Sequence, residues 1–293
     1  MIKITERNED MATIIDGKAV ARDVRAAVRE RAKTFFENNG VRPKLAVILA
    51  GNNPASEVYV SNKEKACGWV GIDSEVVRFP ADVCEEALLS AIDRLNGDRK
   101  VNGILVQLLL PKHICAQKIL NAISPDKDVD GFHPVNAGTL MQGKAALEPC
   151  TPSGCMELIR RTGVPLDGAR AVVIGRSNIV GKPVALMLLR ENATVTLCHS
   201  HTRGLDEIVR EADVVVCATG QPGILNGGML KSGAVVIDVG ITRQPDGTLA
   251  GDADFDSVCE TAGYVTPVPG GVGPMTIAML LQNTMIAAEK QYA

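Results

Sequence analysis

The sequence predicts an α/β protein with two domains. Its 293 residues are roughly the length of two average domains. Stretches with apolar residues at helical spacing alternate along the chain with short runs rich in valine, isoleucine and leucine, a pattern typical of α/β folds. In the second half these runs are apolar throughout, as in parallel strands that helices cover on both faces.

The first half begins with an amphipathic helix over residues 17–39. Val20, Val24 and Val28 recur at helical spacing, and Asp16 can accept hydrogen bonds from the first turn. The elements that follow are expected to be strand 44–51, helix 55–68, strand 74–79, helix 83–95 and strand 102–110.

A long segment without periodicity, residues 124–151, comes next. It is dense in proline, glycine, aspartate and asparagine, and loops of this length usually carry function. Asp126, Asp128 and Asp130 have the spacing of a calcium loop, but Gly131 is misplaced and no bidentate acid follows where one is required. We therefore expect no metal site.

The second half is expected to form a Rossmann-like, doubly wound domain. A helix is predicted at 150–163, and buried strands are predicted at 169–175, 193–199, 212–220 and 233–240. We divide the chain into a first α/β domain of residues 11–150, to which the C-terminal helix 275–293 returns, and a second domain of residues 151–274.

Composition excludes several partners. A net charge of −3 and 3% aromatic residues offer nucleic acid neither a basic surface nor a stacking platform. No run approaches the roughly 20 apolar residues that span a membrane. Residues 1–10 lack the apolar core of a secretory signal, so we expect a cytoplasmic protein in which they are dispensable. The eight cysteines form no C-x-x-C pair, which predicts reduced, buried thiols.

The turn after the first strand of the second domain is typical of nucleotide binding. Gly175 ends the strand, and Gly181 and Pro183 begin a helix. Small residues here let the backbone approach a pyrophosphate beside a helix N-terminus. Ser177 replaces the second glycine of the usual fingerprint, so an ordinary strand-to-helix turn is the alternative.

The end of the next strand favours NADP over NAD. An NAD site would have a carboxylate there for the ribose hydroxyl, whereas residues 198–203 read Cys-His-Ser-His-Thr-Arg. Arg176, Ser177 and Arg203 could instead bind a 2′-phosphate. The two histidines of this run either contact the cofactor or are ordinary loop residues.

Two later segments complete the cofactor prediction. Ile241 follows the fourth strand, where the carboxyl edge of a sheet would meet the nicotinamide ribose. The glycine-rich loop 266–274 either brings its backbone close to a ligand or connects the domains rigidly.

Polar residues also interrupt the first half. Tyr59 and Lys63 are four residues apart on the predicted helix and share a face, which is either part of a site or a solvated charged surface. Gln107 lies inside an apolar strand. Because a buried amide needs hydrogen-bond partners, we expect its side chain to point into a site.

These motifs resemble those of the bifunctional methylenetetrahydrofolate dehydrogenase/methenyltetrahydrofolate cyclohydrolase family over nearly the whole chain. The motifs are Y-V-S-N-K at 59–63, G-I-L-V-Q-L at 103–108, K-D-V-D-G-F-H-P-x-N-x-G at 127–138, P-C-T-P-x-G at 149–154, G-R-S-x-I-V-G-x-P at 175–183 and T-P-V-P-G-G-V-G-P-M-T at 266–276. The resemblance implies NADP-dependent oxidation of methylenetetrahydrofolate and hydrolysis of the product to 10-formyltetrahydrofolate, within one-carbon metabolism and purine biosynthesis. It also implies a homodimer.

The resemblance assigns roles to single residues. Lys63 would be the catalytic lysine, with Tyr59 and Gln107 beside it, and Asp130 would anchor the pterin ring of the folate. Folate would lie on the first domain and NADP on the second, with a cleft between them. The other assignments are Tyr59, Gly270 and Gly271 for substrate, and Gly175, Arg176, Ser177, Ser200 and Ile241 for NADP.

Two residues depart from the family pattern. Leu109 stands where proline is common, which is expected to loosen the junction beside Gln107. His201 stands where arginine or lysine is usual, so one permanent positive charge is missing near the expected 2′-phosphate.

Three other functions compete with this prediction. A short-chain dehydrogenase would have its tyrosine and lysine after the glycine turn, whereas Tyr59 and Lys63 precede Gly175. A dehydrogenase without cyclohydrolase activity remains open. A non-catalytic protein that binds NADP or folate would not need Lys63, Gln107 and Asp130 together.

Overall fold

The computed structural model describes residues 11–144 and 147–293. They form two compact units, which we name by their sheets: the six-stranded unit, residues 11–21 and 151–276, and the three-stranded unit, residues 22–150 and 277–293 without 145–146. The predicted two-domain α/β fold is confirmed. Residues 11–21, which the sequence suggested belong with the first half, lie in the six-stranded unit.

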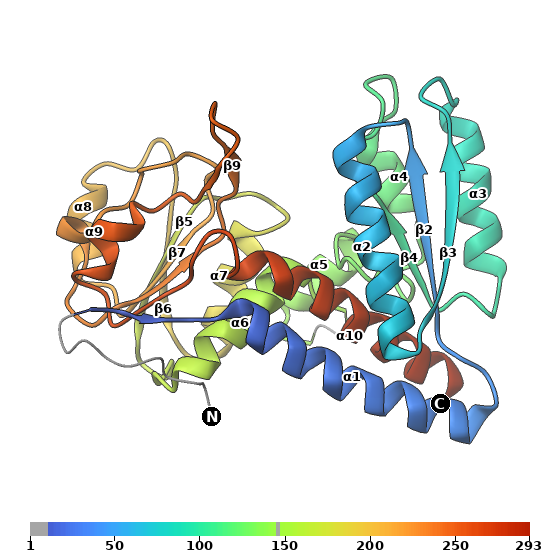
Figure 1. Ribbon diagram of the computed structural model, residues 1–293, viewed down its shortest axis with the longest axis horizontal. Helices are drawn as coiled ribbons and strands as arrows, with labels where there is room; N and C mark the ends of the chain where they lie inside the picture. Colours follow the sequence, from blue (N-terminus) through green and yellow to red (C-terminus); the bar gives the residue numbers. More distant parts are fainter. Residues whose placement is uncertain (1–10, 145–146) are drawn as a thin grey trace. The chain divides into compact units, whose positions relative to one another are not determined.

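The three-stranded unit is built on a parallel sheet in the order β3-β2-β4. Its strands are β2 (Lys44–Ala50), β3 (Asp73–Phe79) and β4 (Gly103–Val106), and its helices are α1 (Gly17–Asn39), α2 (Pro54–Val70), α3 (Glu85–Gly97), α4 (Ala116–Ala122) and α5 (Pro134–Met141). Helices α2 and α3 flank the sheet (Figure 1). Ile48, Ile92 and Ile104 are fully buried in the core beneath α3.

The structure corrects two predictions in this half. The strand expected at 102–110 ends at Val106, so Gln107 lies just beyond it. The expected loop 124–151 contains α5, because Pro134 occupies its first turn and the His133 side chain accepts a hydrogen bond from the Val135 N–H. Eight residues are too few to show helical periodicity in the sequence.

The six-stranded unit has a parallel sheet in the order β1-β11-β8-β7-β5-β6. Its strands are β1 (Thr13–Ile14), β5 (Arg170–Ile174), β6 (Thr194–Cys198), β7 (Val214–Cys217), β8 (Val235–Asp238) and β11 (Tyr264–Val265), and β9 (Thr242–Arg243) and β10 (Leu249–Ala250) form a separate hairpin. The helices are α6 (Cys150–Thr162), α7 (Gly181–Arg190), α8 (Leu205–Arg210), α9 (Phe255–Cys259) and a 3₁₀ turn at Gly227–Met229. Helix α10 (Val272–Tyr292) begins in this unit and belongs to the three-stranded unit from Ile277 onward.

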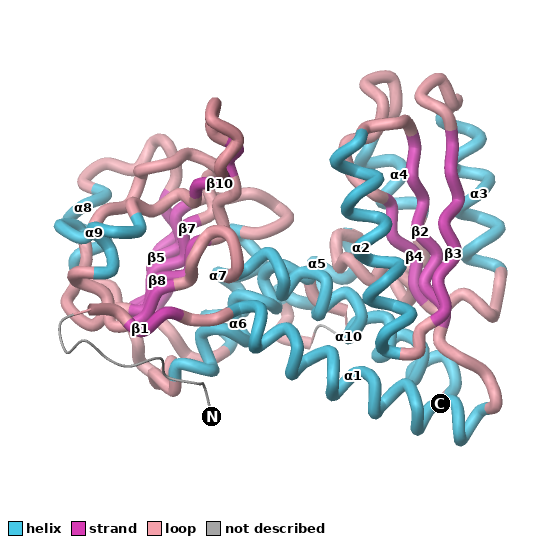
Figure 2. Tube along the Cα trace, viewed as in Figure 1, coloured by secondary structure: helices cyan, strands magenta, loops and turns pink. Residues whose placement is uncertain are grey.

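The four strands predicted for this half form the middle and one edge of that sheet. Figure 2 shows β5, β7 and β8 among its magenta strands. Strand β7 lies between β5 and β8 and is fully buried as predicted. The prediction of a buried strand at 193–199 was wrong, because β6 is an edge strand whose residues alternate in exposure. Strands β1 and β11 were not predicted, because two residues carry no pattern.

Three further observations concern the described residues. No helix within 11–144 or 147–293 has the length and apolar character to cross a membrane. In the same ranges, no three histidine, cysteine or acidic side chains are grouped to hold a metal ion. All eight cysteines are free thiols, but Cys84 and Cys115 are exposed rather than buried because each immediately precedes a surface helix. Residues 1–10, predicted to be dispensable, lie outside the described residues.

Candidate functional site

The structure brings Lys63 and Gln107 together across 44 positions of sequence. Lys63 lies on the partly exposed side of α2, and its Nζ donates a hydrogen bond to Gln107 Oε1 at 2.9 Å. The Gln107 N–H donates to the Ile48 carbonyl at 2.9 Å, which continues the β2–β4 ladder by one residue. The amide therefore stands at the carboxyl end of the edge strand β4 and accepts the hydrogen bond from the lysine.

Asp130 belongs to the same environment. Burial raises the pKa of its carboxyl to about 6, and the nearby positive charge of Lys63 opposes that rise. The neighbouring Gly131 has φ of +74°, and a Cβ there would lie 2.5 Å from the backbone of Glu148 and Pro149. Only glycine permits this close approach, which holds the Asp130 turn against the start of α6.

Two residues that the sequence analysis did not single out support the Asp130 turn. Asn283 of α10 donates from Nδ2 to the carbonyls of Val129 and Glu148, both at 2.8 Å. The Cys150 thiol donates to the Val129 carbonyl at 3.2 Å, and its interaction with Asp130 lowers the pKa of that carboxyl, against the larger effect of burial. The only signal for Asn283 in the sequence is a short polar run, Gln282–Thr284, between apolar stretches of the helix.

Tyr59 and Leu109 are close in sequence to the hydrogen-bonded pair Lys63 and Gln107. Tyr59 lies one turn before Lys63 on α2, and 52% of it is exposed. Leu109 has φ of +80° and is 74% exposed. A proline ring holds φ near −65°, so the backbone after Gln107 has a conformation that proline at this position could not adopt.

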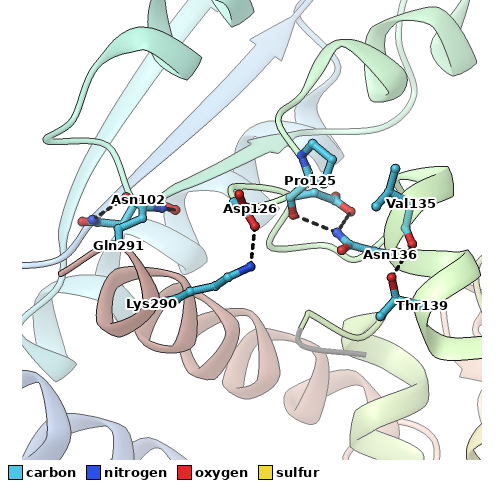
Figure 3. Close-up of polar contacts among 9 residues, drawn as sticks. Asn102, Pro125, Asp126, Val135, Asn136, Thr139, Lys290 and Gln291 are labelled. Atoms are coloured by element: carbon cyan, nitrogen blue, oxygen red, sulfur yellow. Dashed lines mark hydrogen bonds and ion pairs between the residues drawn. The ribbon is translucent and has the colours of Figure 1, made fainter. Parts of the chain in front are cut away.

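The other two aspartates of the expected calcium-like run have structural partners. Asp126 accepts a hydrogen bond from Lys290 Nζ at 2.6 Å (Figure 3). Asp128 Oδ2 accepts from the His133 N–H at 2.8 Å and from Asn136 Nδ2 at 2.9 Å. These carboxylates therefore hold the loop to α5 and α10.

In the turn between β5 and α7, which contains Gly175 and Gly181, backbone atoms pack closely against one another. Gly175 has φ of +117°, and a Cβ there would lie 2.2 Å from the Ala218 carbonyl oxygen. A Cβ on Gly181 would lie 1.9 Å from the Gly175 carbonyl oxygen. Ser177 Oγ accepts hydrogen bonds from the N–H groups of Val180 and Gly181 at 3.1 and 3.3 Å, so it orders the start of α7.

Cationic groups surround the end of β6. Partial burial and the positive charge of Arg176 lower the pKa of His199, with a smaller contribution from His201. The rings of His199 and His201 lie 5.9 Å apart, and the His201 N–H donates to His199 Nδ1 at 3.1 Å. Ser200 and Arg203 are exposed in the same loop. Such a cluster suits an anion.

The remaining predicted residues follow β8 and β11. Ile241 is 49% exposed, and a Cβ on Gly273 would lie 3.7 Å from its Cδ1. Gly270 has φ of +114°, whereas Gly271 is buried, and a Cβ on it would lie 2.7 Å from Thr266 and from the Pro267 carbonyl. Both glycines belong to the six-stranded unit.

Family models match both parts of the chain. One described as the tetrahydrofolate dehydrogenase/cyclohydrolase catalytic domain matches residues 15–130. Another, described as the NAD(P)-binding domain of the same proteins, matches residues 149–292. A bifunctional protein FolD from Polynucleobacter asymbioticus is 56% identical over 279 residues, which cover 95% of this chain and 98% of the relative.

Solved structures of related proteins superpose on nearly the whole of this chain. The bifunctional FolD methylenetetrahydrofolate dehydrogenase/cyclohydrolase from Campylobacter jejuni superposes with a TM-score of 0.93 at 47% identity, covering 95% of this chain and 99% of the other. The methylenetetrahydrofolate dehydrogenase-cyclohydrolase (FolD) from Trypanosoma brucei, complexed with NADP cofactor and inhibitor, superposes with a TM-score of 0.91 at 43% identity, covering 96% and 99%.

Proposed function

Because the chain belongs to the tetrahydrofolate dehydrogenase/cyclohydrolase family, we infer that it oxidises 5,10-methylenetetrahydrofolate with NADP and hydrolyses the methenyl product to 10-formyltetrahydrofolate. The observation that carries the assignment to residues is the hydrogen bond of 2.9 Å between Lys63 Nζ and Gln107 Oε1. It holds an amine at the carboxyl end of a buried sheet, beside the carboxyl of Asp130.

The oxidation needs orientation rather than a protein base. The methylene carbon lies between two nitrogens, and the lone pair of one nitrogen stabilises the positive charge that remains when the C–H bond breaks and its electron pair leaves as hydride. NADP, when bound in its oxidised form, supplies the hydride acceptor. The residues of the chain therefore hold the reacting carbon in place and exclude competing reactions.

The hydrolysis requires proton transfer, and Lys63 is our candidate for it. Water attacks the methenyl carbon, and one C–N bond of the tetrahedral adduct then breaks. One proton of the water goes to the departing nitrogen and the other to solvent. The Lys63 amine accepts the proton from the attacking water and passes it to that nitrogen, while Gln107 orients the amine. Tyr59, on the same helix face, lines the folate pocket.

Asp130 is our candidate anchor for folate. An ionised carboxylate can accept two parallel N–H bonds from the amino-pyrimidinone edge of the pterin, which is stronger than a single neutral contact. Its position beside Lys63 would place the reacting carbon near the amine. Gly270 and Gly271 are proposed as further substrate contacts through their backbone.

The six-stranded unit has features that fit NADP. The glycines at 175 and 181 allow the backbone of the turn to pack closely, and the ten-residue helix α7, whose N-terminus can face a pyrophosphate, begins at Gly181. Arg176 and Ser200 are the proposed contacts to the 2′-phosphate, and His199 lies beside Arg176. Ser177 and Ile241 are the proposed contacts to the phosphates and to the nicotinamide end.

Lys63→Met tests the catalytic assignment. We expect cyclohydrolase turnover to fall about 100-fold or more, because the proton-transfer group is lost, while the dissociation constant for NADP stays unchanged. Absorbance of methenyltetrahydrofolate and a cofactor titration measure the two quantities. Lys65→Met, an exposed lysine two residues along the same helix, is the matched control. Unchanged hydrolysis, or a loss of NADP affinity beyond about tenfold, would make Lys63 a structural residue.

The family resemblance also supports a cytoplasmic homodimer as a proposal. The partly exposed edge strand β6 offers unpaired backbone groups that a second copy could use. Light scattering at the assay concentration would then give twice the 31.0 kDa chain mass, whereas the single mass would contradict the dimer.

A further inference from the structure

Two buried carboxylates lie at the carboxyl edge of the six-stranded sheet, and the proposed mechanism uses neither. Asp238 is the last residue of β8 and is 4% exposed. Asp252 follows the β9–β10 hairpin and is fully buried. A buried carboxylate is stable only where hydrogen-bond donors replace its lost hydration. The donors around Asp238 and Asp252 therefore show which backbone segments the two side chains fix in place.

Asp238 organises the segment that carries Asp252. Its Oδ1 accepts hydrogen bonds from the N–H groups of Gly240 and Asp252, both at 2.9 Å, and its Oδ2 accepts from the Ala253 N–H at 2.9 Å. A Cβ on Gly251 would lie 2.0 Å from Oδ2. The chain is therefore shaped around this carboxylate, and the position of Asp252 follows from it.

Asp252 in turn holds the segment that follows β7. Its Oδ2 accepts hydrogen bonds from the Thr219 N–H at 2.6 Å and from the Gly220 N–H at 3.1 Å. Its Oδ1 is buried without a hydrogen-bond partner among the described residues. That oxygen lies against Gly240, where an added Cβ would be only 2.1 Å away.

The backbone that Asp252 touches is the backbone proposed to receive NADP. Thr219 directly follows Ala218, whose carbonyl packs against the Gly175 turn. Gly240 directly precedes Ile241, the proposed contact at the nicotinamide end. One carboxylate thus contacts the backbone that follows the adjacent strands β7 and β8, and the segment after β7 packs in turn against the Gly175 turn after β5.

We propose that Asp252, held in place by Asp238, is a positioning residue that sets the backbone of the nicotinamide end of the NADP site. The proposal rests on the proposed function, because it takes the Gly175 and Ile241 segments as the cofactor site. It concerns cofactor binding alone. Lys63, Gln107 and Asp130 belong to the three-stranded unit, so hydrolysis of methenyltetrahydrofolate is expected to be independent of Asp252.

Asp252→Ala and Asp252→Asn together test whether the hydrogen bonds that Asp252 accepts, rather than the volume of its side chain, support NADP binding. Alanine removes the acceptor for two buried N–H groups, and we expect the dissociation constant for NADP to rise about tenfold or more. Asparagine keeps the shape and one oxygen that can accept both hydrogen bonds, so its NADP affinity should return to within about threefold of the parent. Asp246→Asn, an exposed acid in the β9–β10 turn, is the matched control.

Three readouts on the full-length protein distinguish the outcomes: NADP titration, dehydrogenase KM against kcat, and cyclohydrolase turnover without cofactor. The proposal requires a selective rise in the NADP constants, with hydrolysis unchanged. Parent-like NADP affinity in Asp252→Ala would overturn it. Absence of NADP binding by the parent protein would instead overturn the proposed function. If the alanine variant does not fold, Asp252→Glu moves the carboxylate by one methylene, and parent-like affinity there would equally overturn the proposal.

Discussion

At the scale of single residues, Asp130 combines two opposing demands. Its proposed contact with the pterin requires an ionised carboxylate, yet burial raises the pKa of that carboxyl to about 6. The positive charge of Lys63 acts against burial. With a pKa of about 6, the Asp130 carboxyl is ionised in most molecules at neutral pH and becomes protonated in mild acid. Folate binding is therefore expected to depend on pH through the Asp130 carboxyl.

This balance predicts a pH dependence with a definite sign. Below the pKa of about 6 the protonated carboxyl can no longer accept two N–H bonds. KM for methenyltetrahydrofolate in the cyclohydrolase reaction should then rise about tenfold per pH unit of further acidification. Initial rates between pH 5 and pH 8 measure it.

Asp130→Asn is the control for that measurement. Its amide does not titrate, so KM should be raised at all pH values and show no inflection near 6. A flat KM in the parent protein down to pH 5 would contradict the role given to the Asp130 carboxylate.

At the scale of secondary structure, Lys127, in the segment between α4 and α5, caps the C-terminal end of helix α3. Helix α3 ends at Gly97, and its last carbonyls need donors from outside the helix. Lys127 is buried, and its Nζ donates to the carbonyls of Leu95, Asn96 and Asp98 at 3.0, 2.9 and 2.7 Å. Although this residue belongs to the motif that carries Asp130, its side chain points away from the site into a structural role.

Lys127→Met should accordingly destabilise the protein without changing the chemistry. Methionine keeps the apolar stem but leaves three carbonyls without their donor, and we expect the free energy of unfolding to fall by about 3 kcal/mol. Urea denaturation measures the change. Lys118→Met is the control, because Lys118 pairs with Glu85 on the surface and its loss should change stability little. Equal stability of the two variants would contradict the role of Lys127.

At the scale of the whole molecule, the elements with a periodic pattern of apolar residues could be predicted from the sequence. The elements and contacts that depend on residues far away in the chain could not. The apolar strands and the helix at 17–39 follow from periodicity and were found. The two-residue strand Thr13–Ile14 forms only because Tyr264–Val265 offers it a partner. The roles of Asn283 and Asp252 likewise depend on backbone groups far away in sequence. Lys63 and Gln107 were singled out as a charge on a predicted helix face and an amide in an apolar run, and the structure joins them by a hydrogen bond.

The central claim is that one chain performs both reactions, and a single spectroscopic assay tests it most directly. Purified protein is mixed with methylenetetrahydrofolate and either NADP or NAD, and reduced cofactor and methenyl absorbance are followed together. We expect reduced NADP to form without lasting methenyl absorbance. Accumulation of the methenyl product would remove the hydrolytic role of Lys63, and absence of reduced cofactor with both nucleotides would contradict the account as a whole.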